Sequence, residues 1–255
     1  MFCYNTTNLG DNMETFIHKA NDLETIKKNI NDSSINGIEI DFQFCDGNMI
    51  NTHNFYEGFP LIRCNWVDKR SYEFYQNQQN TGLYWDIDQI IPLIPDDKKI
   101  LIDLKNWITG LAGTIINHQN PYLGNQRQLA ELFWLHMEEF KNQKNILIQS
   151  YDHLLIWEIM KLAEKERISY DFDFGLIVRT TFQAADALLY AYQLPLAFLA
   201  IRYNQLIKMG GAKKICSDIK RPINIYGWFD IDDFYISKAK RLELIKDAKC
   251  DGYIK

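Results

Sequence analysis

The stretch Gly37–Phe44 reads GIEIDFQF and is typical of a β-strand that is covered on both faces. Successive side chains of a strand point in opposite directions, so its isoleucines and Phe42 share one face, while Glu39 and Asp41 share the other. In a barrel whose helices pack against the apolar face, both carboxylates point into the interior.

Seven further segments resemble this one, and each is a short apolar run rather than an alternating one. We expect strands at Glu14–His18, Ile100–Lys105, Asn145–Ser150, Phe174–Thr180, Leu196–Arg202, Ile223–Trp228 and Gly252–Ile254. Segments with helical periodicity lie between them. We expect helices at Asp22–Asn31, Gln126–Phe140, Leu154–Lys165, Gln183–Tyr192, Tyr203–Lys214 and Ile231–Asp247.

Eight strands that alternate with helices favour a (β/α)8 barrel, that is, a TIM barrel. The chain has 255 residues, which is close to the roughly 250 that this fold typically needs. An open doubly wound sheet is the alternative, but no Gly-x-Gly-x-x-Gly motif follows the first expected strand. We expect one domain over residues 1–255, with an aromatic-rich loop insertion at about residues 54–95.

The composition excludes several classes of protein. The chain carries 28 basic and 33 acidic residues, a formal net charge of −5, whereas a nucleic-acid-binding protein is usually basic. We find no apolar run long enough to span a membrane and no signal peptide, so we expect a cytoplasmic protein. Five scattered cysteines indicate free thiols. The aromatic-rich insertion leaves open a transient contact with a membrane surface.

Chemically active side chains cluster at the ends of the first three expected strands, where the active site of a TIM barrel lies. His18 ends the first strand, and the pair Glu39 and Asp41 lies on the second. His53 follows a short turn, and the third strand ends with Asp103 and Lys105 on one face. Three carboxylates suit a hard divalent cation, Mg²⁺ or Ca²⁺, and Lys105 suits an anionic substrate oxygen.

Three residues at the ends of later strands are candidate substrate ligands. Trp228 ends the seventh expected strand and could stack on, or pack beside, a substrate group. Arg179 and Arg202 end the fifth and sixth strands and could reach a phosphate. The other histidines, His118, His136 and His153, fall in a loop, a helix and a helix start, so we do not expect them to be catalytic.

This ordered set of motifs resembles the glycerophosphodiester phosphodiesterase family, within the superfamily that includes the phosphatidylinositol-specific phospholipases C. The matching motifs are His18, Gly37-x-Glu39-x-Asp41, Asp46-Gly47, His53, Asp103-x-Lys105, Ser150-Tyr151-Asp152, Tyr226-Gly227-Trp228 and Asp251-Gly252-Tyr253-Ile254. The likeness is dense over residues 16–105 and 223–254. It implies a metal-dependent hydrolase of glycerophosphodiesters or lysophospholipid headgroups, with His18 and His53 as the acid–base pair and Glu39, Asp41 and Asp103 as metal ligands.

The sequence departs from the family pattern at three places. Lys19 stands where the family has a phosphate-binding arginine, so it takes that substrate-binding place here. Asn54 replaces an aspartate after His53. Asp103 replaces the usual glutamate and is similar to the sphingomyelinase D, or phospholipase D, branch, whose chemistry yields a cyclic phosphate. Two alternatives therefore remain: a cyclizing phospholipase D-like enzyme, and a catalytically inactive barrel that serves as a binding protein.

Overall fold

The computed structural model describes residues 13–18, 20, 23–45, 48–51, 86–105, 126–229 and 236–254. Eight parallel strands form a closed barrel, because β1 pairs with both β9 and β2. The barrel strands are β1 (Glu14–Ile17), β2 (Gly37–Cys45), β4 (Lys99–Lys105), β5 (Ile146–Ser150), β6 (Asp173–Val178), β7 (Phe198–Arg202), β8 (Asn224–Trp228) and β9 (Gly252–Ile254). A short strand, β3 (Asn48–Asn51), pairs antiparallel with β2. The expected TIM barrel is confirmed.

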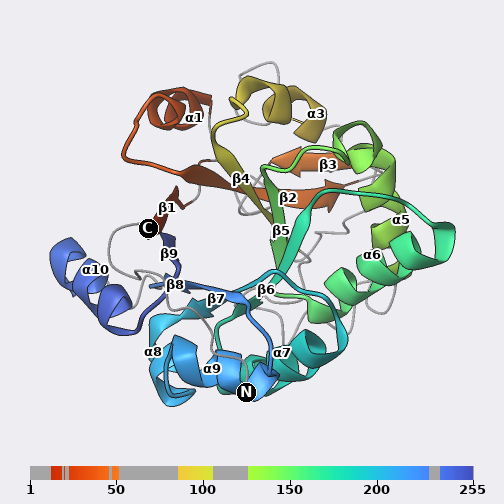
Figure 1. Cartoon of the computed structure of the whole chain (residues 1–255). Helices are drawn as coiled ribbons and strands as arrows, with labels where there is room; N and C mark the ends of the chain where they lie inside the picture. The colour runs from red at the N-terminus through yellow and green to blue at the C-terminus, as the bar shows by residue number, and fades with distance from the viewer. Residues whose placement is uncertain are drawn as a thin grey trace, which may run out of the picture.

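The described helices surround the barrel (Figure 1). They are α1 (Leu23–Ile30), α3 (Ile87–Ile90), α5 (Gln126–Met137), α6 (His153–Glu166), α7 (Thr181–Gln193), α8 (Tyr203–Lys208), α9 (Ala212–Ile219) and α10 (Lys238–Asp247), with short 3-10 turns at Ile91–Leu93 and Glu138–Phe140. Within the described ranges, no helix combines the length and the apolar character that a membrane span requires.

All eight expected barrel strands are present, with ends that differ from the expected ones by no more than two residues. The single helix expected at Tyr203–Lys214 is wrong, because α8 and α9 are separate helices. Gly210 and Gly211 divide them, with φ values of +86° and +81° that the right-handed helix does not allow. Helix α10 begins after Ser237, whose hydroxyl caps it by accepting a hydrogen bond from the Lys240 N–H.

Aromatic side chains fill the barrel interior away from the carboxyl ends of the strands. The rings of Phe16 and Phe198 each lie against that of Tyr226, with centroids 5.4 and 5.3 Å apart. Glycines make room for them: a Cβ on Gly175 would lie 2.4 Å from the Phe198 ring, and one on Gly252 would lie 2.4 Å from the Tyr226 ring. The polar interior residues therefore lie beyond this aromatic cluster, at the carboxyl end of the strands, where TIM barrels carry their active sites.

Candidate metal centre

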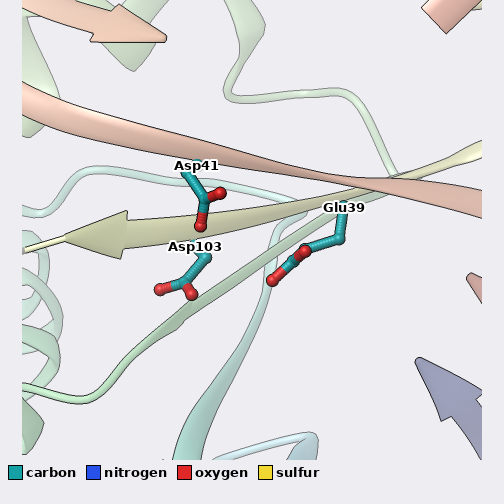
Figure 2. Close-up of side chains that lie close together, drawn as sticks. All are labelled: Glu39, Asp41 and Asp103. Atoms are coloured by element: carbon teal, nitrogen blue, oxygen red, sulfur yellow. The ribbon is translucent and has the colours of Figure 1, made fainter. Parts of the chain in front are cut away.

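Three carboxylates meet inside the barrel on two neighbouring strands. Asp41 of β2 and Asp103 of β4 are paired in register, and Glu39 lies one inward-facing position before Asp41. At most 2% of each residue is exposed to solvent. One oxygen atom from each of the three lies within 4.8 Å of the others. Figure 2 shows the three carboxylate groups gathered together beside β2 and β4.

Lys105 supplies a positive charge to this cluster. Its ammonium lies 2.7 Å from Asp41 Oδ1 and also contacts Asp103 Oδ2. Burial alone would lower the pKa of Lys105, but Asp103 and Asp41 raise that pKa well above its ordinary value. Lys105 is therefore protonated, and three carboxylates with one ammonium leave a formal charge of −2.

The cluster fits a divalent cation. Buried carboxylates repel one another and lose hydration, so a cluster of three is costly without added positive charge. A formal charge of −2 is the amount that one divalent ion cancels, and carboxylate oxygens are the ligands that Mg²⁺ and Ca²⁺ prefer. Glu39, Asp41 and Asp103 therefore form a possible metal site.

His18 lies next to the acidic cluster. Its Nε2 atom is 3.5 Å from Glu39 Oε2, and 32% of its side chain is exposed. The segment that follows it is fastened over β2, because the Ala20 N–H donates a 2.8 Å hydrogen bond to the Glu39 carbonyl oxygen. The Ala20 side chain is fully buried. His18 thus lies beside the carboxylates, with part of its side chain exposed to solvent.

Tyr151, Trp228 and Gln149 also occupy the interior at this end of the barrel. The Tyr151 and Trp228 rings meet edge to face, with centroids 6.2 Å apart. Burial raises the pKa of the Tyr151 phenol, and the positive charge of Lys105 lowers it by a smaller amount. The net result is a pKa well above its ordinary value. Among the described residues, Trp228 Nε1 and Gln149 Oε1 are buried atoms without a hydrogen-bond partner.

The motif Ser150-Tyr151-Asp152 included Tyr151 without giving it a role, and Gln149, which directly precedes this motif, was assigned none. The available signal was the alternation along β5, since Leu147, Gln149 and Tyr151 occupy every second position. Leu147 and Tyr151 both belong to the cluster of side chains that fills the barrel interior. That alternation becomes informative only when the barrel register shows that this face is the inner one.

The remaining predicted substrate ligands lie on the β6–β8 side of the barrel. Arg202 ends β7, and its Cα is paired in register with that of Trp228 on β8. Arg179 follows β6 directly, and its charge acts on the Tyr151 phenol. Lys19 and His53 fall outside the described residues, so their predicted roles stay predictions.

His153 has a structural position outside the barrel. Its Nδ1 lies 2.6 Å from Asp186 Oδ2 on α7, and its Nε2 lies 2.9 Å from the Ile177 carbonyl oxygen on β6. Only 4% of the residue is exposed. Both ring nitrogens are thus engaged in joining α6, α7 and β6.

The fold matches several solved glycerophosphodiester phosphodiesterases over nearly the whole chain. The enzyme from Thermotoga maritima is 17% identical, with a TM-score of 0.61 over 96% of this chain and 95% of that one. The one from Parabacteroides distasonis is 14% identical, with a TM-score of 0.64 over 96% and 92%. The one from Agrobacterium tumefaciens str. C58 is 12% identical, with a TM-score of 0.57 over 95% of each chain.

Comparisons by sequence find no counterpart: no family model matches the chain, and no curated protein matches it. At these identities the structural matches show the fold. The fold and the site together define the class of protein: a (β/α)8 barrel with the fold of the glycerophosphodiester phosphodiesterases and a buried acidic triad that could bind a metal ion.

Proposed function

We propose that this protein is a divalent-metal-dependent phosphodiesterase that acts on glycerophosphodiesters or related lysophospholipid headgroups. One observation carries the proposal: Glu39, Asp41 and Asp103 form a buried triad inside the barrel, and the Lys105 ammonium contacts two of its members, Asp41 and Asp103. The fold shared with several glycerophosphodiester phosphodiesterases supports the choice of substrate class. A phosphodiester carries one negative charge, which an acidic protein can accept only where cations reverse the local sign.

The triad would hold Mg²⁺ or Ca²⁺, which when bound stabilises the negative charge that develops on phosphate oxygens during cleavage. Lys105 would bind a phosphate oxygen from the side of β4. Lys19, Arg179 and Arg202 are further proposed phosphate or headgroup ligands. Trp228 would pack against the headgroup, since its ring lies at the carboxyl end of β8.

His18 and His53 are the proposed acid–base pair. In such a pair, one neutral histidine accepts a proton from the attacking hydroxyl, while the other, protonated, donates one to the leaving oxygen. For His18, the position beside Glu39 and the partial exposure suit contact with both the site and the substrate. The carboxylate of Glu39 would also orient the imidazole.

A second candidate activity is intramolecular attack by a substrate hydroxyl, which releases the alcohol and leaves a cyclic phosphate. The observation that favours it is Asp103, since an aspartate at this position is similar to the sphingomyelinase D branch. Hydrolysis and cyclization would use the same residues and differ only in the source of the attacking hydroxyl.

A ³¹P NMR assay tests the proposal. Glycerophosphocholine and lysophosphatidylcholine are incubated separately with the full chain, in Mg²⁺, in Ca²⁺ and in chelator. Appearance of a phosphomonoester supports hydrolysis, and appearance of the cyclic diester supports the second activity. If the folded protein with metal cleaves neither substrate, the enzyme proposal fails and a binding role replaces it.

A further inference from the structure

Gln149 lies beside the acidic triad, on the next strand of the barrel. Its Cα is paired in register with that of Asp103, which is in turn paired with Asp41. The three residues therefore form one row across β2, β4 and β5, with all three side chains on the inner face. Neighbouring strands lie about 4.8 Å apart, so side chains at paired positions on the same face lie side by side. The Gln149 side chain is thus an immediate neighbour of Asp103.

The amide oxygen of Gln149 is buried and lacks a donor. Only 1% of the residue is exposed, and within the described part of the chain nothing donates a hydrogen bond to Oε1. Burying an amide oxygen without a donor is costly, so such an atom in a barrel interior calls for a partner. Its register partner on β4 is Asp103, whose carboxylate cannot donate, and the ammonium of Lys105 contacts Asp41 and Asp103.

The backbone around Gln149 is held in place. The Ser150 hydroxyl donates a 2.6 Å hydrogen bond to the Leu104 carbonyl oxygen on β4. The same hydroxyl accepts one from the Asp152 N–H at 3.0 Å. The bond to Leu104 ties β5 to β4 directly beside the pair Asp103 and Gln149, which fixes the distance between their backbones and preorganises the row.

We propose that Gln149 Oε1 is a fourth protein oxygen ligand of the divalent cation held by Glu39, Asp41 and Asp103. The inference rests on the metal site of the proposed function and extends it. A neutral amide oxygen adds a ligand without adding charge, so the site keeps the formal −2 that one divalent ion cancels. It also gives a partner to the buried Oε1, which has none among the described residues. Figure 2 shows the three carboxylates that would share the ion with it.

A fourth protein oxygen favours Ca²⁺ over Mg²⁺. Ca²⁺ takes six to eight oxygen ligands, including side-chain amide oxygens, whereas Mg²⁺ keeps several waters and uses only one or two carboxylates. Loss of the amide oxygen should therefore weaken Ca²⁺ binding more than Mg²⁺ binding.

The test measures metal binding by the full chain directly, by titration calorimetry with Ca²⁺ and with Mg²⁺. Gln149→Met keeps the length of the side chain but replaces the amide with a thioether, a poor ligand for hard cations. Gln205→Met is the matched control, because Gln205 is also buried but its Oε1 accepts a hydrogen bond from Thr181. We expect Ca²⁺ affinity to fall about tenfold or more in Gln149→Met, with a smaller loss for Mg²⁺ and no change in the control.

Luminescence lifetimes of bound Eu³⁺ in H₂O and D₂O count the waters on the ion. We expect Gln149→Met to gain one coordinated water over the wild type. If Gln149→Met does not fold, Gln149→Glu replaces it: it should bind Ca²⁺ more tightly with no added water. Wild-type affinity and hydration in Gln149→Met, or an added water in Gln149→Glu, would overturn the inference while leaving the proposed function intact. A wild-type chain that binds neither metal would overturn both.

Discussion

The ammonium of Lys105 lies 2.7 Å from Asp41 Oδ1 and also contacts Asp103, inside a cluster of three buried carboxylates. In the part of the chain that the structure describes, Lys105 is the lysine whose ammonium contacts these carboxylates and offsets their repulsion. A bound metal ion would share the task of neutralising these carboxylates, and under the proposed function the Lys105 N–H donors would then serve an anionic substrate.

Removing this ammonium should destabilise the metal-free protein. In Lys105→Met, the buried carboxylates of Asp41 and Asp103 lose the ammonium that contacts them, and breaking a buried ion pair from one side costs about 3–5 kcal/mol. We expect a lower midpoint of thermal unfolding in chelator, measured by circular dichroism, and recovery of most of the loss on adding Ca²⁺ or Mg²⁺. Lys214→Met removes an exposed partner of Asp218 and should change little. Equal stability of Lys105→Met and wild type in chelator would contradict this role.

Removing one carboxylate of the triad should abolish most of the stabilisation that a bound metal ion gives to the folded protein. For the wild type, a metal ion at 100 times its Kd adds about 2.7 kcal/mol to the free energy of unfolding. Asp41→Asn should lose most of this gain, because Asp41 is fully buried in the triad. Glu131→Asn, on the exposed face of α5, is the control and should keep it. The readout is the metal-induced shift in the urea unfolding midpoint, and a full shift in Asp41→Asn would exclude Asp41 as a ligand.

Substitution of His18 should affect the reaction rather than the fold. Its side chain is partly exposed, so His18→Asn should unfold within a few degrees of the wild type. Removal of a general acid or base typically lowers kcat by about 10²–10⁴-fold. His136→Asn on α5 is the control and should keep full activity. Unchanged kcat in His18→Asn would remove His18 from the mechanism.

The buried thiol of Cys250 should make the free energy of unfolding depend on pH in the alkaline range. Burial, with a contribution from Asp251, raises the pKa of its thiol to about 12, compared with about 8.5 in an unfolded chain. The folded state therefore holds this proton more tightly, and the resulting stabilisation is complete below about pH 8.5 and is lost as the pH rises toward 12. At pH 9, iodoacetamide should modify Cys250 slowly in the folded protein and rapidly in urea, as followed by peptide mass spectrometry. Equal rates in both states would contradict the raised pKa.

The fold was largely predictable because its signal is local and repeated. Each barrel strand is a short apolar run, and the inner position of Glu39 and Asp41 follows from alternation along β2. The break at Gly210 and Gly211 was harder, because the apolar periodicity of α8 resumes in α9 on the far side of the two glycines.

The site was predictable only where its residues form a motif. Glu39, Asp41, Asp103 and Lys105 come from two strands that are paired in register, so two short sequence patterns already define the cluster. Gln149 has no such signature: a single glutamine in an apolar strand has no assignable role until the register sets it beside Asp103.

The most direct test compares two titrations of the wild-type protein over one series of Ca²⁺ or Mg²⁺ concentrations. One follows metal binding by calorimetry, and the other follows the initial rate of glycerophosphocholine cleavage by ³¹P NMR. We predict that the two curves coincide, and that Glu39→Ala loses both binding and cleavage. Full cleavage in chelator, or full activity in Glu39→Ala, would contradict the claim that the buried triad holds the metal on which catalysis depends.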